Sequence, residues 1–395
     1  MKRLPRMLAC AALLGGALLG GCKSADEAQV WGVYQEPIEP QPLPPARGES
    51  ELKWLWSKRL GAGADDGYAI LKPAYRGDGM YAASRGGVVY KLNPANGSAR
   101  WRRDLDAEIF SAVGVDDLRT AVALDDGTVI ALDAASGEEL WRTPLRQQIS
   151  AIPAVDSGRV VARTASGQII GLDAHSGVVA WTLERSVPGL SIHGDSTPVI
   201  ARDAVFTGLA NGRLLANNVT TGREYWETEV SFASGRNELE RITDSDTAPL
   251  IAADTVYTAT YQGNVVALQR QNSAVKWKAK VSSRLPMSLA DGKLLVTDEL
   301  GAVIAIDAAN GAILWTQEAF RGRGMSRPLA HNGRVVVGDA SGDIHSLDLS
   351  SGTLLETRKA VSGAVVGLIP GPDQFAVFSS TGNLSVWTLP RDAAN

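Results

Sequence analysis

The stretch DDGTVIALDAASGEELW, residues 125–141, decides the fold because it recurs along the chain. Two close copies are ASGQIIGLDAHSGVVAW at residues 165–181 and ELGAVIAIDAANGAILW at residues 299–315. Weaker copies end in tryptophan at positions 101, 226 and 277, and a seventh, ASGDIHSLDLSSGTLLE, has Glu356 where tryptophan is expected. In the six tryptophan copies the tryptophan follows the first glycine by fourteen positions. Such regular self-similarity indicates a repeat architecture.

Eight first glycines divide the chain into units of about forty residues. They are Gly87, Gly127, Gly167, Gly212, Gly263, Gly301, Gly342 and, in a truncated last copy, Gly382. Each unit contains four short apolar segments, and the third, such as residues 129–132, is apolar on both faces, as in a sheet that neighbouring sheets cover on both sides. The sequence therefore predicts an all-β fold, an eight-bladed β-propeller of four-stranded antiparallel blades.

The last unit lacks a fourth strand, and the missing strand is found at the other end of the chain. Residues 54–60, WLWSKRL, resemble the last strand of a repeat. We expect this N-terminal strand to pair with the C-terminal strands and close the ring, which also hides two sheet edges.

The repeated residues have structural roles in this fold. The first glycine permits the positive φ of a tight hairpin turn. A side-chain oxygen accepts a backbone N–H of the following turn at Asp133, Asp173, Asp307 and Asp348. Tryptophan fills the space between adjacent blades, where its ring N–H needs an acceptor.

The N-terminus has the pattern of a bacterial export signal. Three basic residues precede an apolar run at 7–19, which is too short to span a bilayer and ends in LGGC at 19–22. The run resembles a lipobox, so Cys22 is expected to be acylated after residues 1–21 are removed; a plain signal peptide with an incidental cysteine is the alternative. Lys23 in place of aspartate favours the outer membrane, with the lipid-anchored protein facing the periplasm.

Proline-rich residues 22–50 are expected to form a lipidated flexible tether, before a propeller at 51–390 and a tail at 391–395. The mature chain would have no cysteine besides the acylated one, and hence no disulfide. The net charge of −4 and pI of about 5.7 argue against a nucleic-acid partner.

Catalytic groups are not apparent in the sequence. The repeats resemble those of pyrroloquinoline-quinone (PQQ) dehydrogenases, so a periplasmic PQQ-dependent dehydrogenase is the main alternative. Those enzymes use a vicinal cysteine pair and a calcium ion, and this chain has no such cysteine pair. The histidines are scattered and are expected at the surface or in turns, and the acidic pairs at 116–117 and 125–126 are expected to be solvated turn residues. We therefore expect no catalytic, metal or cofactor site.

Two stretched linkers depart from the repeat and carry the candidate partner-binding residues. Residues 186–200 contain Leu190 and Ile192 beside His193, and residues 229–251 present acidic side chains that include Asp244 and Asp246. Adjacent blades would place these linkers side by side on one face. An apolar pair with a charged rim is typical of a protein interface, although a solvated loop in which Leu190 only covers the blade gives the same composition.

The lipobox, the proline-rich tether, the eight repeats and the segments PGLSIHGDSTP and NELERITDSDTAP together resemble the BamB family. This family is the propeller lipoprotein subunit of the outer-membrane β-barrel assembly machinery. Its matching loops read Leu-Ser-Leu-Arg-Gly and Arg-Leu-Ser-Asp-Val-Asp-Thr-x-Pro and contribute to docking on a periplasmic POTRA domain of the barrel subunit BamA. The resemblance implies that Leu190 and Ile192 make apolar contacts and that Asp244 and Asp246 make acidic ones.

His193 stands where the family usually has arginine, so a forked permanent cation is replaced by a group that is mostly neutral at pH 7. The resemblance implies a non-enzymatic scaffold that helps to assemble and insert outer-membrane β-barrel proteins, with unfolded clients as further partners. A generic periplasmic adhesion or signalling propeller is a third possibility.

Overall fold

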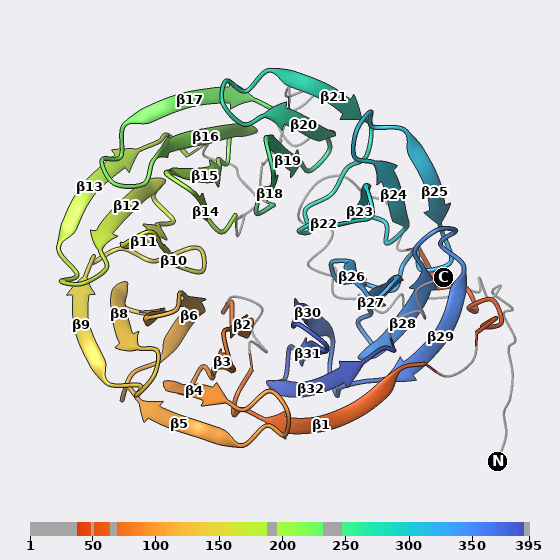
Figure 1. The fold of residues 1–395 in the computed structure, drawn as a ribbon, viewed down its shortest axis with the longest axis horizontal. Helices are drawn as coiled ribbons and strands as arrows, with labels where there is room; N and C mark the ends of the chain where they lie inside the picture. The colour runs from red at the N-terminus through yellow and green to blue at the C-terminus, as the bar shows by residue number, and fades with distance from the viewer. Residues whose placement is uncertain (1–37, 49–50, 64–68, 188–195, 232–246, 391–395) are drawn as a thin grey trace, which may run out of the picture. The chain divides into compact units, whose positions relative to one another are not determined.

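The computed structural model describes residues 38–48, 51–63, 69–187, 196–231 and 247–390. Within these ranges the chain forms eight four-stranded sheets that stand around a common axis (Figure 1). Every pairing inside a sheet is between neighbouring antiparallel strands. The predicted eight-bladed propeller is therefore confirmed.

The first four blades follow the chain without interruption. Their strands are β2 (Ala74–Arg76), β3 (Gly79–Ala83), β4 (Val88–Leu92) and β5 (Ala99–Asp104) in blade 1; β6 (Ile109–Val115), β7 (Arg119–Leu124), β8 (Thr128–Asp133) and β9 (Glu139–Pro144) in blade 2; β10 (Ala154–Asp156), β11 (Arg159–Arg163), β12 (Gln168–Asp173) and β13 (Val179–Glu184) in blade 3; and β14 (Val199–Ala201), β15 (Ala204–Gly208), β16 (Arg213–Asn218) and β17 (Glu224–Glu229) in blade 4.

Blades 5 to 7 repeat the plan, and blade 8 combines both ends of the domain. Their strands are β18 (Leu250–Ala252), β19 (Thr255–Ala259), β20 (Val265–Gln269) and β21 (Val275–Ala279) in blade 5; β22 (Ser288–Ala290), β23 (Lys293–Thr297), β24 (Val303–Asp307) and β25 (Ile313–Gln317) in blade 6; β26 (Leu329–His331), β27 (Arg334–Gly338), β28 (Asp343–Asp348) and β29 (Leu354–Lys359) in blade 7; and β30 (Val365–Pro370), β31 (Phe375–Ser379), β32 (Asn383–Thr388) and β1 (Lys53–Arg59) in blade 8.

The ring closes as the sequence predicts. Strand β1 is the outer strand of blade 8 and pairs antiparallel with β32, with Lys53 opposite Thr388 and Arg59 opposite Asn383. Residues from the two ends of the domain therefore share one sheet.

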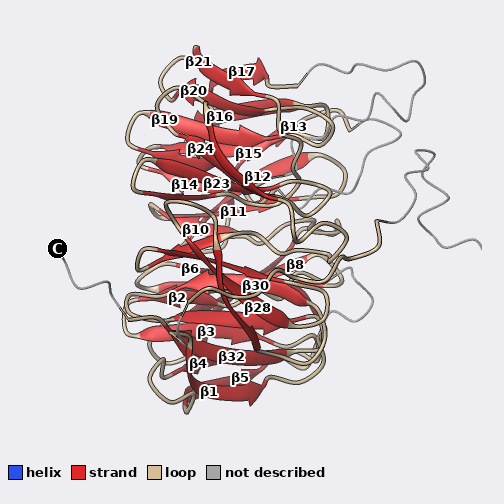
Figure 2. Cartoon of the chain, turned by 90° about the vertical axis from the view of Figure 1, so that its right-hand side faces the viewer, coloured by secondary structure: helices blue, strands red, loops and turns tan. Residues whose placement is uncertain are grey.

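The core lies between the blades. The second and third strands of a blade are buried along almost their whole length, as in β8, where only the last residue, Asp133, is partly exposed. Outer strands such as β9 alternate between exposed and buried positions. Seen from the side, the strands run between two loop-bearing faces of the ring (Figure 2). No helix in the described part of the chain is long and apolar enough to cross a bilayer.

In seven of the eight blades a tryptophan binds the blade to the next one. The ring nitrogen of Trp141 in blade 2 donates a hydrogen bond to the Ala174 carbonyl of blade 3, at 3.0 Å. Gly177 of blade 3 lies against the same ring, so closely that a Cβ atom at residue 177 would approach it to 2.6 Å. The same bond to the next blade is made by Trp56, Trp101, Trp181, Trp226, Trp277 and Trp315.

The turn residues also take their predicted roles. Gly127 has a φ of +80°. The Asp133 carboxylate accepts the backbone N–H groups of Ser136 and Ala135, and these bonds, with Ser136 contributing most, lower the pKa of Asp133. Gly263 is an exception, because the positive φ of its turn falls on Gln262.

Two histidines differ from the expectation that they lie at the surface or in turns. His345 lies in β28 at a position where most other repeats have an apolar core residue, and it is buried. Asp339 Oδ2 lies 3.3 Å from its Nε2, and Thr357 Oγ1 lies 3.0 Å from its Nδ1. His331 is also buried, with its ring edge-on to Phe375. The surface prediction is wrong at His345 because both of its ring nitrogens have partners, which makes burial of a polar ring tolerable.

Candidate partner-binding face

The two faces of the propeller carry different connections. In an antiparallel four-stranded blade, the turns between first and second strands and between third and fourth strands lie on one face. The turns between second and third strands and the connections between blades lie on the other, which we call the connection face. The described ends of the two long connections, after β13 and after β17, therefore lie on the connection face.

The predicted contact residues lie outside the described part of the chain. Leu190, Ile192 and His193 fall in residues 188–195, and Asp244 and Asp246 fall in residues 232–246. Cys22 falls in residues 1–37. The structure describes the points at which both long connections leave and rejoin the propeller.

A hydrogen-bonded clamp joins the ends of the two long connections. Ser196, near the end of the first connection, donates from its hydroxyl to the backbone carbonyl of Thr247, near the end of the second, at 3.2 Å. The Ser196 hydroxyl also accepts the Gly208 N–H at 3.1 Å. The Thr247 hydroxyl donates to the Ala259 carbonyl at 2.9 Å and accepts the Ala259 N–H at 3.1 Å.

Burial makes this clamp rigid. Ser196 and Thr247 are both fully buried, so their hydroxyls and the backbone groups they bind cannot easily exchange partners with solvent. The Arg163 guanidinium, also buried, donates to the Ser196 carbonyl at 3.5 Å. The two long connections thus return to the propeller at adjacent, fixed points.

A charged cluster lies on the outer side of blades 3 and 4, next to the start of the first long connection. Arg185 donates to Glu227 at 2.8 Å and to Glu224 at 2.6 Å, and Arg213 donates to the other oxygen of Glu227 at 2.5 Å. Each of these charges has an opposite partner within hydrogen-bond distance, so the cluster fixes the neighbouring outer strands to each other.

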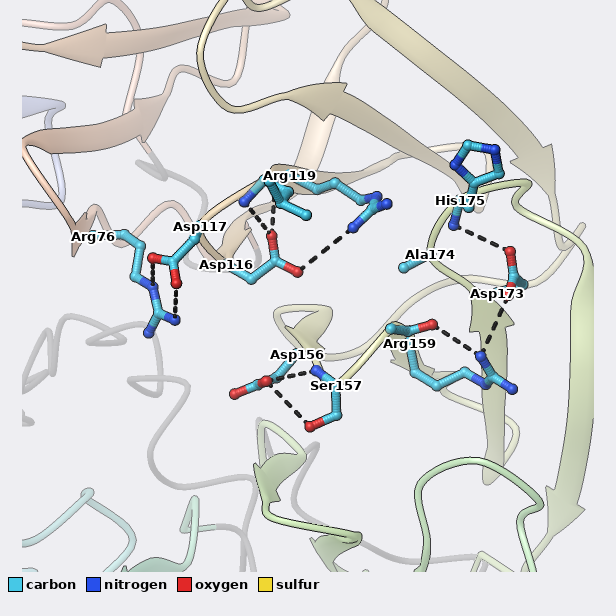
Figure 3. A network of polar contacts seen from close by, with 12 residues as sticks. Arg76, Asp116, Asp117, Arg119, Asp156, Ser157, Arg159, Asp173, Ala174 and His175 are labelled. Carbon is cyan, nitrogen blue, oxygen red and sulfur yellow. Dashed lines mark hydrogen bonds and ion pairs between the residues drawn. The ribbon is translucent and has the colours of Figure 1, made fainter.

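The opposite face uses its carboxylates in turns and ion pairs (Figure 3). Asp117 forms two hydrogen bonds with Arg76, at 2.7 and 3.1 Å, and this guanidinium lowers the pKa of Asp117. The Asp116 carboxylate accepts the backbone N–H of Arg119 at 2.6 Å. Asp173 pairs with Arg159 at 3.3 Å. These carboxylates are therefore engaged in hydrogen bonds and ion pairs within the propeller.

The described residues include titratable side chains of the kinds that bind metal ions or act on substrates. Among them, no group of three or more His, Cys, Asp or Glu side chains is placed to hold a metal ion. The paired His345 and Asp339 side chains are enclosed within blade 7, where Phe320 packs over the imidazole with its ring centre 4.8 Å away. This dyad is a core contact with no opening toward a substrate.

Comparison with known proteins decides the family. The family model described as outer membrane protein assembly factor BamB matches residues 28–117, 85–317 and 301–391. The chain belongs to the BamB family. It is 43% identical to BamB of Pseudomonas aeruginosa over 319 residues, which cover 80% of this chain and 82% of the relative. It is 30% identical to BamB of Escherichia coli over 338 residues, which cover 83% and 85%.

Solved structures agree with this assignment. The crystal structure of BamB from Moraxella catarrhalis matches with a TM-score of 0.79 and 28% identity, over 86% of this chain and all of that chain. A quinohemoprotein alcohol dehydrogenase from Comamonas testosteroni matches with a TM-score of 0.67 at 15% identity, over 87% of this chain and 77% of that chain. The dehydrogenase therefore shares the propeller fold, and nothing further follows from that likeness.

The clamp residues are the part of the site that sequence reasoning missed. Both hydroxyl residues stand two positions before a proline that precedes the first strand of a blade, in STP at 196–198 and TAP at 247–249. SRP at 326–328 has the same spacing, and Ser326 accepts the Gly338 N–H at 2.9 Å as Ser196 accepts that of Gly208. A serine or threonine two residues before a proline could therefore have predicted where the chain enters the first strand of a blade.

Proposed function

We propose that this chain is a non-enzymatic scaffold of the outer-membrane β-barrel assembly machinery. Membership of a family of outer membrane protein assembly factors supports this role. The structural support for the proposal is the Ser196–Thr247 clamp. It joins the ends of the two connections whose sequences depart most from the repeat.

The partner is a periplasmic POTRA domain of a BamA-like barrel subunit. Leu190 and Ile192 supply the apolar centre of the contact, and Asp244 and Asp246 supply acidic groups at its rim. His193 makes a rim contact in place of a permanent cation. An interface of ordinary size buries about 800 Å² per partner, and it would be formed by the connection face. The opposite face and the outer blade edges stay accessible to unfolded outer-membrane protein clients.

The protein acts while anchored to the outer membrane and facing the periplasm. Acylated Cys22 provides the anchor, and several acyl chains hold a protein on a bilayer far more durably than one. The apolar run before Cys22 and the small residues that flank it support this assignment.

A pull-down from membranes tests the docking role. Leu190→Ala combined with Asp244→Ala should weaken capture of the barrel subunit, with partners identified by mass, while the far-UV spectrum and the melting temperature stay unchanged. A matched control replaces a leucine and an aspartate of the opposite face, Leu118→Ala with Asp117→Ala, and should leave capture intact. Unaltered capture by the first variant would falsify the assignment of the loops, and recovery of an unrelated partner in place of the barrel subunit would favour a generic adhesion or signalling propeller.

A dehydrogenase assay tests the enzymatic alternative separately. The purified protein, incubated with PQQ and calcium, should not reduce an electron-accepting dye above the rate of the same mixture without protein. Robust turnover would overturn the non-enzymatic scaffold.

A further inference from the structure

Blade 7 lacks the tryptophan that fastens each other blade to its neighbour. Glu356 occupies that position in β29, opposite Ser346 of β28, and is only 7% exposed. A carboxylate cannot donate the hydrogen bond that an indole gives to the next blade. By the repeat pattern that bond would go to the Leu389 carbonyl, which instead accepts a hydrogen bond from the Asn332 side-chain amide at 2.8 Å.

The buried carboxylate of Glu356 binds the start of the N-terminal segment. One of its oxygens accepts the backbone N–H groups of Glu51 at 2.8 Å and Leu52 at 2.9 Å. The other accepts from the Arg358 guanidinium at 2.5 Å. Hydrogen bonds to an ionised acceptor are roughly twice as strong as neutral ones, and a buried carboxylate left without them would be costly.

Neighbouring contacts hold the same two residues from other directions. The Glu51 carboxylate forms two hydrogen bonds with the Arg334 guanidinium of blade 7, at 2.8 and 3.0 Å. The Leu52 side chain is buried and packs in a cluster that contains Trp387 and Leu389 of blade 8. Leu52 thus supplies apolar contact at the junction where the other blades use an indole.

Residues 38–48 continue along blades 6 and 7. Arg47 and Gly48 donate their backbone N–H groups to the Leu354 and Leu355 carbonyls of β29, both at 3.1 Å. Further back, the Gln41 carbonyl accepts a hydrogen bond from Arg323 at 2.5 Å, in the connection between blades 6 and 7. Leu43 packs against the apolar cluster of blades 6 and 7.

We propose that residues 38–48 together with Glu51 and Leu52 form a strap that blade 7 binds, and that Glu356 is the residue that anchors it. The strap precedes β1, the strand that closes the ring. Tension on the N-terminal side of β1 alone would load the Lys53–Thr388 end of the β1–β32 ladder first and open it pair by pair. With the strap bound, tension must first break the contacts of Glu356 and Arg334. The strap thereby protects ring closure, and this inference does not rest on the docking role.

Hydrogen exchange on the full-length protein, read by mass spectrometry, tests the strap. In the unmodified protein the amides of Glu51 and Leu52 should be protected. Glu356→Ala should speed their exchange about tenfold to a hundredfold, the range for loss of a hydrogen bond to a charged group. Glu356→Gln, which keeps one acceptor oxygen, should give an intermediate rate. The control Glu318→Gln changes an exposed glutamate of the neighbouring connection and should have no effect.

Glu356→Trp keeps the test decisive if the alanine variant fails to fold. It restores the repeat residue, so the propeller should still fold, with the amides of β6 to β9 in blade 2 as protected as before. The indole competes with Leu52 for the blade junction, so exchange at Glu51 and Leu52 should rise at least tenfold. Unprotected amides in the unmodified protein, or unchanged protection in both Glu356→Ala and Glu356→Trp, would overturn the proposal.

Discussion

Replacing Ser196 by alanine tests what the clamp contributes to stability and to binding. The substitution leaves the buried Gly208 N–H and the Thr247 carbonyl without the partners they have in the native protein. An unsatisfied buried group costs about 1–3 kcal/mol, so we expect the free energy of unfolding to fall by about 2 kcal/mol. Urea unfolding followed by far-UV circular dichroism measures this loss.

The same variant should also bind the partner less tightly. Ordering the two loosened connections on binding should cost about 1 kcal/mol of binding free energy, which raises the dissociation constant for purified POTRA domains about fivefold. Biolayer interferometry with the immobilised domains measures this change.

Ser326→Ala is the matched control, because Ser326 makes the corresponding bond to Gly338 in a blade whose preceding connection, residues 318–328, is not one of the two long connections. It should lose similar stability and keep native affinity. Equal affinities for Ser196→Ala, Ser326→Ala and the unmodified protein would refute the claim that the clamp positions the binding connections.

Three further predictions concern the propeller. Trp141→Ala should lower the unfolding free energy by about 3–5 kcal/mol, whereas Leu140→Ala at the adjacent, 46% exposed position should change it by less than about 0.5 kcal/mol; equal effects in urea titrations would contradict the role of the indole. Gly177→Ala should cost more than about 1 kcal/mol because residue 177 has a φ of +71° and lies against the Trp141 ring; a neutral result in the same assay would argue against that close contact. Burial of Asp339 favours a higher pKa, but hydrogen bonds from His345 and from backbone amides outweigh it and lower the pKa. The ionised carboxylate therefore contributes its full share of the unfolding free energy above the unfolded pKa of about 3.9, and this share is lost as the pH falls through the folded pKa. Between pH 5 and pH 2 the Asp339→Asn variant should lose less stability than the unmodified protein, and an identical loss would show that Asp339 does not titrate there.

The fold could be predicted because each residue that recurs in the repeats of this chain has one structural role. Gly127 is needed for its positive φ, Asp133 binds the backbone of its own turn, and Trp141 reaches the next blade. The strand at residues 54–60 could be assigned to blade 8 because its pattern matched a strand that the last copy lacked.

Contacts that use no repeated pattern could not be predicted in the same way. Glu356 was visible as a departure from the motif, but its ligands are backbone amides of Glu51 and Leu52, which carry no side-chain signature and lie some three hundred positions away. The burial of His345 likewise depends on Asp339 and Thr357 being brought to it by the hairpins of one blade. The candidate contact residues stay a prediction from the sequence and the family.

Site-specific photocrosslinking in cells tests the central claim most directly, namely that recognition belongs to the long connections and not to the repeated framework. A photoreactive amino acid is placed at position 190, at position 244, or at position 118 on the opposite face, where Leu118 is 63% exposed. We predict adducts with the barrel subunit from positions 190 and 244 and none from position 118. Adducts from position 118 alone, or none from either long connection, would contradict the account.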